Sequence, residues 1–550
     1  MAFNSRIILA KDIKMDREHN NVLDYSETQM LTLLRSQSHL VVEKTNYNFV
    51  RQSKNKIDVD ISYDTCLQSN YIGFQNPSYS NKWFFAFVID VEFVNPATTR
   101  ITFEVDDFST WWDYWDQKAC FVVREHVSDD SVGANTIPEN VETGDYIINN
   151  MSPMFYNEMN LNMVIVIGLS RALSPLHDDT DRIYSGLYSG LYYVAFGPTN
   201  GPENATKFIR AMATNGYQED IVSIFVLPQK LVKTTATYTI AIGDVSGIVL
   251  SDVDDSTNPI SFGDNVSVTL NSTLNGYTPR NNKLKCFPFN YLLVSNNAGG
   301  TATYNYEDFL NNNPQFKVVG CFAQGGSIKM IPQNYKKYET ATYNNASAMY
   351  GLNGAKYPTC AWLSDSYINW LSQNSVNLAF GFGSSAVQTI AGIGLLAAAP
   401  FTGGSTALLG GGMLLSGGIS AGETMMKLHE QSFQPNQAHG NTNGGDIGYT
   451  GHMMSFDYFQ MSIRSEYARS IDDYFDRVGY KVNRIKIPNQ NTRPYWNYVQ
   501  IGKEECCGYS NNESISVPPL AMENINNMFR KGITIWHNHS NLGNYSLNNH

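Results

Sequence analysis

About 57 consecutive residues of this chain, between Asp365 and Glu423, contain no Asp, Glu, Lys, Arg or His. An apolar helix of about 20 residues is long enough to cross a bilayer. Pro400, Gly403 and Gly404 divide the run into two segments of that length. The run therefore predicts one re-entrant hairpin, which a chain that is polar elsewhere has to shelter from water.

The composition of this run favours a membrane-active segment over the alternative, a buried core hairpin. About twelve glycines would weaken a core helix, since each costs ~1 kcal/mol relative to alanine. Small residues allow helices to pack closely in lipid, where every backbone amide has to bond internally. We expect the turn at Pro400, Gly403 and Gly404. The large apolar side chains expected to contact lipid are Phe380, Phe382, Ile390, Ile393, Leu395, Leu396, Phe401, Leu408, Leu409, Met413, Leu414, Leu415 and Ile419.

The rest of the chain is polar, aromatic and acidic. Charged residues make up 16% of the 550 residues and aromatic residues 13%, which favours a mainly β fold with large buried contacts, often between subunits. The formal net charge of -12 argues against nucleic-acid recognition and against attraction to anionic lipids, because both need a basic surface.

Seven cysteines are scattered along the chain without CxxC spacing. We expect small buried thiols in a reducing compartment, and no disulfide framework, metal site or cofactor. The N-terminus lacks the basic and apolar regions of a signal peptide, so we expect synthesis in a cytoplasm, that of a bacterial host if the chain is viral.

Strands and turns are expected along most of the chain, with a few helices. Asn95 and Pro96 signal a turn that joins two strands into a hairpin. The expected strands are residues 83–89, 100–105, 120–127, 163–168, 221–227, 237–242 and 533–536, with residues 128–160 as a loop. The expected helices are residues 204–213, 362–380, a segment with its apolar stripe at Ile463, Tyr467, Ile471, Tyr474, Phe475 and Val478, and a segment between Pro519 and Gly532.

This pattern predicts a β-rich tube domain, an outer knob lobe and a long apolar loop insertion. The two terminal parts are expected to close together into the tube. The expected parts are residues 1–130 (N-terminal, tube-forming), 131–335 (central knob lobe), 336–379 (lead-in), 380–455 (apolar loop with a flexible return) and 456–550 (helix and strand completing the tube).

Three sets of polar residues are candidate sites. His537 and His539 could share one strand face as metal ligands, but solvated histidines are the simpler interpretation. Residues 252–255 resemble a calcium loop without its glycine, and are expected to be an acidic turn. Carboxylates among aromatic side chains could form a glycosidase site, although a polar-rimmed aromatic interface explains them equally well. These carboxylates are Asp106, Asp107, Asp113 and Asp116. We expect no catalytic residues.

Short strings near both ends of the chain occur in a recognisable order. They are residues 71–76 (YIGFQN), 81–88 (NKWFFAFV), 121–127 (FVVREHV), 466–470 (EYARS), 479–484 (GYKVNR), 497–500 (NYVQ), 532–537 (GITIWH) and 543–545 (GNY). Together they resemble the tail tube (tail knob) proteins of small short-tailed phages of the Picovirinae type. Residues 130–335 resemble that family much less.

The resemblance implies a homo-hexameric, β-rich tube at the distal end of a phage tail, joined to other tail or collar (connector) proteins. In that family, apolar loops plug the lumen and then form a pore in the host cell membrane, and residues 380–422 match them. Viral double-stranded DNA would pass through the lumen without specific binding. The alternatives are a receptor-binding adhesin, a cell-wall glycan hydrolase and, less favoured, a monomeric pore-forming toxin.

Overall fold

The structure, a computed structural model, describes residues 5–45, 50–76, 80–156, 159, 163–177, 183–184, 187–253, 260–261, 266–320, 322, 327–336, 348–356, 359–360, 454–510 and 515–550. The fold is mainly β, as the sequence predicts. The chain divides into two compact units. Unit 1 combines residues 1–141 with residues 470–550, and unit 2 comprises residues 142–469.

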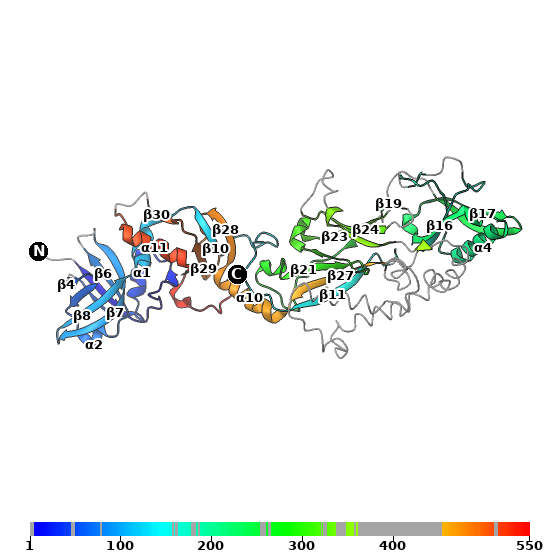
Figure 1. Cartoon of the computed structure of the whole chain (residues 1–550). Coiled ribbons are helices and arrows are strands. Elements are labelled where there is room, and N and C mark those ends of the chain that lie inside the picture. Colours follow the sequence, from blue (N-terminus) through cyan, green and yellow to red (C-terminus); the bar gives the residue numbers. More distant parts are fainter. Residues whose placement is uncertain are drawn as a thin grey trace. The chain divides into compact units, whose positions relative to one another are not determined.

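A seven-stranded antiparallel sheet forms one part of unit 1 (Figure 1). Alternate residues of its strands point to opposite faces, so that Ile7 and Leu9 enter one apolar core while Ile8 and Ala10 enter another. In spatial order its strands are β3 (Leu40–Lys44), β1 (Arg6–Ala10), β6 (Tyr71–Asn76), β7 (Lys82–Asn95), β8 (Thr98–Val105), β5 (Lys56–Val59) and β4 (Val50–Ser53).

The expected hairpin on either side of Asn95 and Pro96 is confirmed as β7 and β8. Strand β6 pairs with β7 only as far as Phe87, whereas β7 and β8 continue to pair to the turn. Because residues 88–95 extend past β6, large side chains near the turn remain exposed, with Phe93 60% exposed.

A five-stranded sheet joins the two ends of the chain. The short β2 near the N-terminus pairs in parallel with β31, which lies beside β29. Trp496 and Trp536 are fully buried there, with ring centroids 4.9 Å apart. The strands are β2 (Asn21–Leu23), β31 (Ile533–Trp536), β29 (Trp496–Ile501), β10 (Cys120–Glu125) and β28 (Tyr480–Lys486), and the separate pair is β9 (Trp115–Gln117) with β30 (Cys507–Tyr509).

The helices near the C-terminus largely match the prediction. α11 ends before Gly532 as expected, with Ile525 and Phe529 fully buried. The apolar stripe predicted for α10 is wrong at two positions: Ile463 belongs to the preceding strand, and Tyr474 is exposed. The described helices of four or more residues are α1 (Glu27–Leu34), α2 (Tyr63–Cys66), α3 (Asp107–Trp111), α4 (Gly201–Thr214), α10 (Ser465–Val478) and α11 (Pro519–Lys531).

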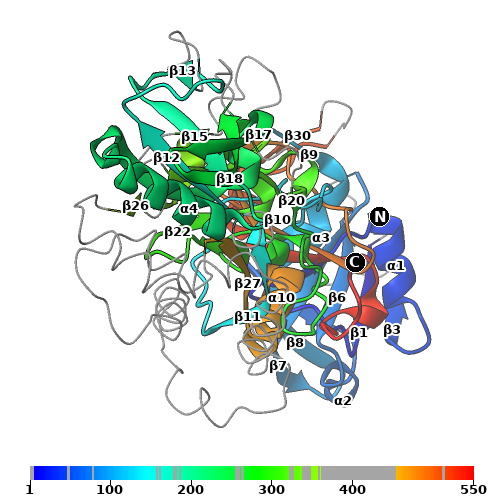
Figure 2. The same ribbon diagram turned by 90° about the vertical axis from the view of Figure 1, so that its right-hand side faces the viewer.

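Unit 2 contains three larger sheets, and helix α4 lies against β18 and β15 (Figure 2). The four-stranded sheet orders β11 (Tyr146–Met154), β27 (Phe456–Ile463), β21 (Asn290–Ser295) and β22 (Thr301–Tyr304). The six-stranded sheet orders β17 (Thr234–Ile242), β18 (Val245–Val253), β15 (Tyr192–Phe196), β12 (Met163–Leu169), β16 (Ile221–Pro228) and β26 (Thr359–Cys360). The third sheet contains β19 (Ile260–Ser261), β23 (Gln315–Gly320), β24 (Ser327–Gln333) and β25 (Leu352–Lys356), with β20 (Val266–Ser267) on β23, and β13 (Ile183–Tyr184) pairs with β14 (Leu187–Tyr188).

The prediction of a loop over residues 128–160 is wrong in part, because residues 146–154 form strand β11. Only Ile148 and Met154 of this strand are buried, and the register shifts between Ile148 and Asn150. A strand that is mostly half-exposed and irregular lacks the alternation from which strands are recognised. Pairing with β27, far along the chain, stabilises it instead.

Gly479 ends α10 as predicted, with a φ of +62° and its N–H donating to the Phe475 carbonyl oxygen at 2.8 Å. A Cβ at this position would lie 2.1 Å from the Glu125 carbonyl oxygen. We predict that Gly479→Ala lowers the free energy of unfolding by about 1–3 kcal/mol more than Gly543→Ala does. Gly543 also has a positive φ but open space around it, so the pair separates steric overlap from backbone strain. If denaturant titrations show the same loss of unfolding free energy for Gly479→Ala and Gly543→Ala, steric overlap at Gly479 is ruled out.

Candidate functional sites

The uncharged run lies outside the described residues, as do its predicted lipid-contacting side chains, its turn and the helix expected over residues 362–380. The described strands on either side of it are β26 and β27, and both belong to unit 2. In the part of the chain that the structure describes, no helix is long and apolar enough to cross a membrane.

The strand that follows the run is firmly anchored in unit 2. β27 pairs with β11 on one side and β21 on the other, and seven of its eight residues are buried. Ser455 lies just before this strand, and its backbone carbonyl accepts a hydrogen bond from the Asn297 side-chain amide at 3.3 Å. The chain therefore re-enters a well-packed sheet directly after the segment that contains the run.

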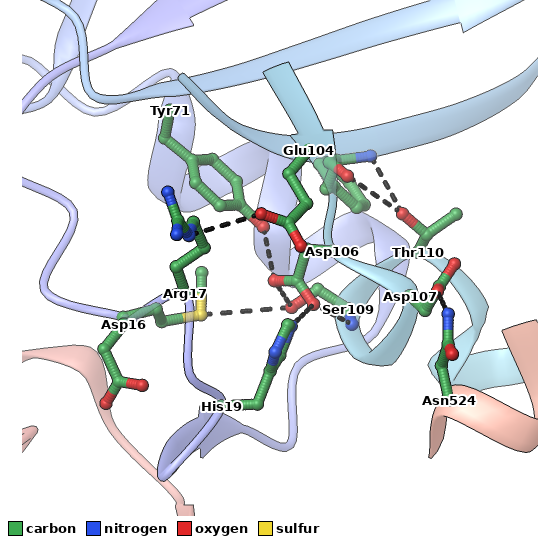
Figure 3. Close-up of polar contacts among 12 residues, drawn as sticks. Asp16, Arg17, His19, Tyr71, Glu104, Asp106, Asp107, Ser109, Thr110 and Asn524 are labelled. Carbon is green, nitrogen blue, oxygen red and sulfur yellow. Dashed lines mark hydrogen bonds and ion pairs between the residues drawn. The ribbon is translucent and has the colours of Figure 1, made fainter. Parts of the chain in front are cut away.

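The predicted carboxylate cluster contains one fully buried carboxyl, that of Asp106 in unit 1 (Figure 3). Asp106 caps α3 by accepting a hydrogen bond from the Ser109 N–H at 3.1 Å. Its other oxygen accepts from the Ser109 hydroxyl at 2.7 Å and from the Tyr71 hydroxyl at 2.8 Å. Buried polar groups are stable only when bonded in this way, so Asp106 holds α3 against the seven-stranded sheet.

His19 completes this network as an ion pair, with Nε2 3.3 Å from the same Asp106 oxygen that accepts from the Ser109 N–H. Burial lowers the pKa of His19, but the hydrogen bond and the negative charge of Asp106 outweigh this effect, and the pKa is raised. Burial likewise raises the pKa of Asp106, yet the bonds from His19 and Ser109 prevail and the pKa is lowered. The two shifts share one cause, a buried pair whose charged forms stabilise each other.

The other predicted carboxylates serve separate structural contacts. Asp107 accepts a hydrogen bond from the Asn524 side chain at 2.7 Å, and Asp113 accepts one from the Glu27 N–H at 2.8 Å. Asp116 lies in β9, opposite Gly508 of β30. With Asp106 buried at the centre, these four carboxylates do not form the facing pair that a glycosidase requires.

The C-terminal histidines are not solvated, which corrects the prediction. His537 Nδ1 lies 2.6 Å from an Asp24 carboxylate oxygen, and His539 is buried, accepting a hydrogen bond from the Lys14 N–H at 3.3 Å. Burial lowers the pKa of His539 to about 4, so its ring is neutral and serves as an acceptor. The pairing of the chain ends, which the sequence does not reveal, brings these partners together.

Two further predictions can be compared with the described residues. Asp252 and Val253 lie in strand β18 rather than in an acidic turn, and Asp254 and Asp255 lie outside the description. The described residues contain no group of three or more His, Cys, Asp or Glu side chains placed to hold a metal ion. The cysteines whose burial is described are buried, as predicted: Cys66, Cys120, Cys286, Cys506 and Cys507.

Comparison with known proteins decides between the families that such a fold allows. A family model described as the C-terminal domain of tail knob protein gp9 of Bacillus phage phi29 matches residues 254–550, more than half of the chain. The chain belongs to this family. It is therefore a structural component of a phage tail and of the virion, and the predicted resemblance to tail knob proteins is confirmed.

Other similarities extend over nearly the whole of this tail knob protein. A model of the caudoviral major tail protein N-terminus matches residues 3–116. Tail knob protein gp9 of Bacillus phage phi29 is 25% identical and covers 99% of this chain and 98% of its own length. The gp9 protein of Bacillus phage PZA is also 25% identical, covering 96% of each. The solved tail knob protein gp12 of bacteriophage C1 has the same fold, with a TM-score of 0.60 at 13% identity over 98% of this chain and 97% of that one.

Unit 2 of this tail knob protein holds a buried carboxyl that the sequence analysis missed. Glu307 is 6% exposed, and its Oε1 accepts a hydrogen bond from the Phe287 N–H at 3.0 Å. Its Oε2 is buried without a hydrogen-bond partner among the described residues. Burial raises the pKa of Glu307 to about 7, with neighbouring Asp308 acting in the same direction and Lys336 opposing it. Nothing in the local sequence distinguishes Glu307 from a surface acid.

We predict that protonation of His19 stabilises unit 1. Because its pKa is raised on folding, the contribution is complete below the ordinary pKa of about 6.5 and is lost as pH rises through the folded value. The free energy of unfolding should therefore fall across that interval, and His19→Gln should flatten the fall. Denaturant titrations followed by tryptophan fluorescence report mainly on this unit, since six of the eight tryptophans of the chain lie within its bounds. Asp106→Asn should flatten the profile in the same way, and an unchanged slope in either variant would refute the pairing.

We predict that unit 2 gains stability on acidification through Glu307. Between pH ~4.5 and ~7 the folded chain holds a proton that the unfolded chain has released, so the free energy of unfolding falls as pH rises, by about 3 kcal/mol in all. Glu307→Gln should remove this dependence and protect β21 and β27 against hydrogen exchange at pH 8. Asp244→Asn, which exchanges a charge for an amide at an exposed position of unit 2, is the control. Equal exchange rates at pH 8 in Glu307→Gln and the unaltered protein would rule the effect out.

Proposed function

We propose that this tail knob protein forms the distal DNA conduit of a short phage tail and carries a membrane-penetrating loop. Residues 380–422 plug the lumen of the assembled tail before infection. They then leave it and enter the host cell membrane as re-entrant hairpins, making a pore for genome delivery. The single observation that supports this best is the absence of any charged side chain over about 57 residues of an otherwise polar chain.

The position of the run supports its role as a delivered segment. It is bounded by strands of unit 2 on both sides, and the strand that follows it is buried and paired on both edges. Such a boundary lets the run change its surroundings while the sheets of unit 2 stay folded. Family membership supports the location in the tail, and the plug and the pore are our inference.

Association of several copies, a homo-hexamer in our proposal, would help both the insertion of the run into the membrane and the passage of DNA through the lumen. One hairpin rich in Gly and Ser gains little on transfer into lipid, whereas small residues let neighbouring hairpins pack closely. The acidic net charge of -12 lets DNA slide through a lumen without sticking, because phosphate binding requires cations. Collar proteins of the tail would hold the other end of the conduit.

We predict that charges placed in the run abolish membrane penetration without affecting the fold. Leu395→Asp with Leu396→Asp should reduce dye release from liposomes at least tenfold, since each carboxylate costs roughly 3 kcal/mol at the centre of a spanning helix. Deletion of residues 380–422 should have the same effect. Assembly into tails, checked by electron microscopy, should survive both changes.

The matched control is Leu395→Ile with Leu396→Ile, which keeps the run apolar and should leave dye release unchanged. If the deletion variant releases dye as fast as the unaltered protein, the run is not the membrane-active segment and the proposal fails. If electron micrographs of the assembled protein show no ring of subunits, the proposed conduit is wrong, whatever the result of the dye-release experiment.

A further inference from the structure

The free end of the β7–β8 hairpin carries an apolar patch that no other described part of unit 1 covers. Phe93 is 60% exposed, and Ile89, Val94 and Leu67 of the α2 segment are exposed as well. The Phe93 ring contacts Tyr63 at the start of α2, with ring centroids 6.1 Å apart, so the hairpin and α2 form one surface. We call this set the hairpin patch.

Negative charge accompanies the hairpin patch. Asp90 follows Ile89 directly, at a register shift in the pairing of β7 with β8, and its side chain is exposed. The Asp90 carboxylate has no ion-pair or hydrogen-bond partner within the described ranges, in contrast to Asp58, which binds Arg100 at 2.8 Å. Asp64 of α2 is also exposed. In the β7–β8 register Asp90 pairs with Thr102 and Phe93 with Thr99, so these two side chains lie on opposite faces of the hairpin. The free edge of β7 therefore carries an apolar side chain on one face and an unpaired acid on the other.

A second apolar patch of the opposite charge lies on β28. This strand is at the edge of the five-stranded sheet and pairs only with β10 among the described strands. Ile485 is 75% exposed and Ile487, just after the strand, 55%. Arg484 is exposed on the opposite face of β28 from Ile485, since the two residues pair with Val122 and Phe121 of β10. Its guanidinium has no partner among the described residues. We call this set the edge patch, and its open backbone groups add hydrogen-bonding capacity.

We propose that the hairpin patch of one copy of this chain docks on the edge patch of the next copy, with Asp90 facing Arg484. The proposal rests on the homo-oligomeric conduit proposed above and names the surface that builds it. Phe93 and Ile485 supply the apolar contact, and the two unpaired charges set its orientation.

A second copy fits this pair of surfaces because one chain provides both halves. The hairpin patch and the edge patch lie at opposite ends of unit 1 (Figure 1), so each copy can use both at once. Such a contact is heterologous, and it closes into a ring when the rotation between copies allows it. The opposite charges favour this pairing over hairpin-to-hairpin or edge-to-edge contacts, which would bring like charges together.

The test is a charge exchange in the full-length protein, followed by sedimentation velocity over a range of concentrations. Asp90→Lys and Arg484→Glu should each weaken self-association about tenfold or more, and the double variant Asp90→Lys/Arg484→Glu should restore it to within about threefold. Phe93→Ser and Ile485→Ser should weaken self-association to the same extent at low and at high salt concentration, because they remove apolar contacts and not charges. The matched controls are Glu505→Lys and Lys503→Glu, which reverse exposed charges of unit 1 elsewhere and should have no effect.

Three results would overturn the proposal. If the single reversals assemble like the unaltered protein, or if the double variant is as weak as the singles combined, these surfaces do not meet, while the conduit itself stands. If the unaltered chain stays monomeric at every concentration, both this docking and the homo-oligomeric conduit fail. Because all the substituted side chains are exposed, circular dichroism should show an unchanged fold in every variant.

Discussion

The pairing of the two chain ends in one sheet is the constraint on which the rest of this structure depends. β31 from the C-terminal segment lies between β2 and β29. The fully buried rings of Trp496 and Trp536 contact each other there and make the junction a core rather than a surface contact. Unit 2 is therefore inserted into unit 1, and the uncharged run is in turn inserted into unit 2. Both ends of each insertion are anchored, so a segment that changes its surroundings stays attached to folded structure.

Local sequence was enough to predict those elements whose stability is local. The β7–β8 hairpin follows from alternating apolar residues around Asn95 and Pro96. The end of α10 follows from Gly479, because only a glycine fits at this position beside the Glu125 carbonyl. β11 was missed because its pairing partner lies some 300 residues away and half of its surface is exposed. Tyr474 was wrongly placed on the buried face, because periodicity identifies a stripe but not its width.

The site residues divide along the same line. The uncharged run was recognisable because its signal is compositional and needs no partner. Asp106, by contrast, stood out among aromatic residues, yet only the fold shows that it caps α3 and binds His19 and Tyr71. Glu307 gave no signal at all, since its raised pKa comes from burial that long-range packing creates. His19 and Glu307 favour their protonated forms in the folded protein, whereas the buried His539 favours its neutral form. Mild acid therefore strengthens unit 2 through Glu307, while His19 and His539 act in opposite directions on unit 1.

The central claim is that residues 380–422 enter lipid. Cross-linking from a photoactivatable group in the acyl chains of liposomes, mapped by mass spectrometry on the full-length protein, tests it most directly. The account predicts cross-links concentrated in that run, including around Leu395 and Leu414, and few in units 1 and 2 outside it. Cross-links spread over the exposed hairpin patch or the edge patch, with none in the run, would contradict it.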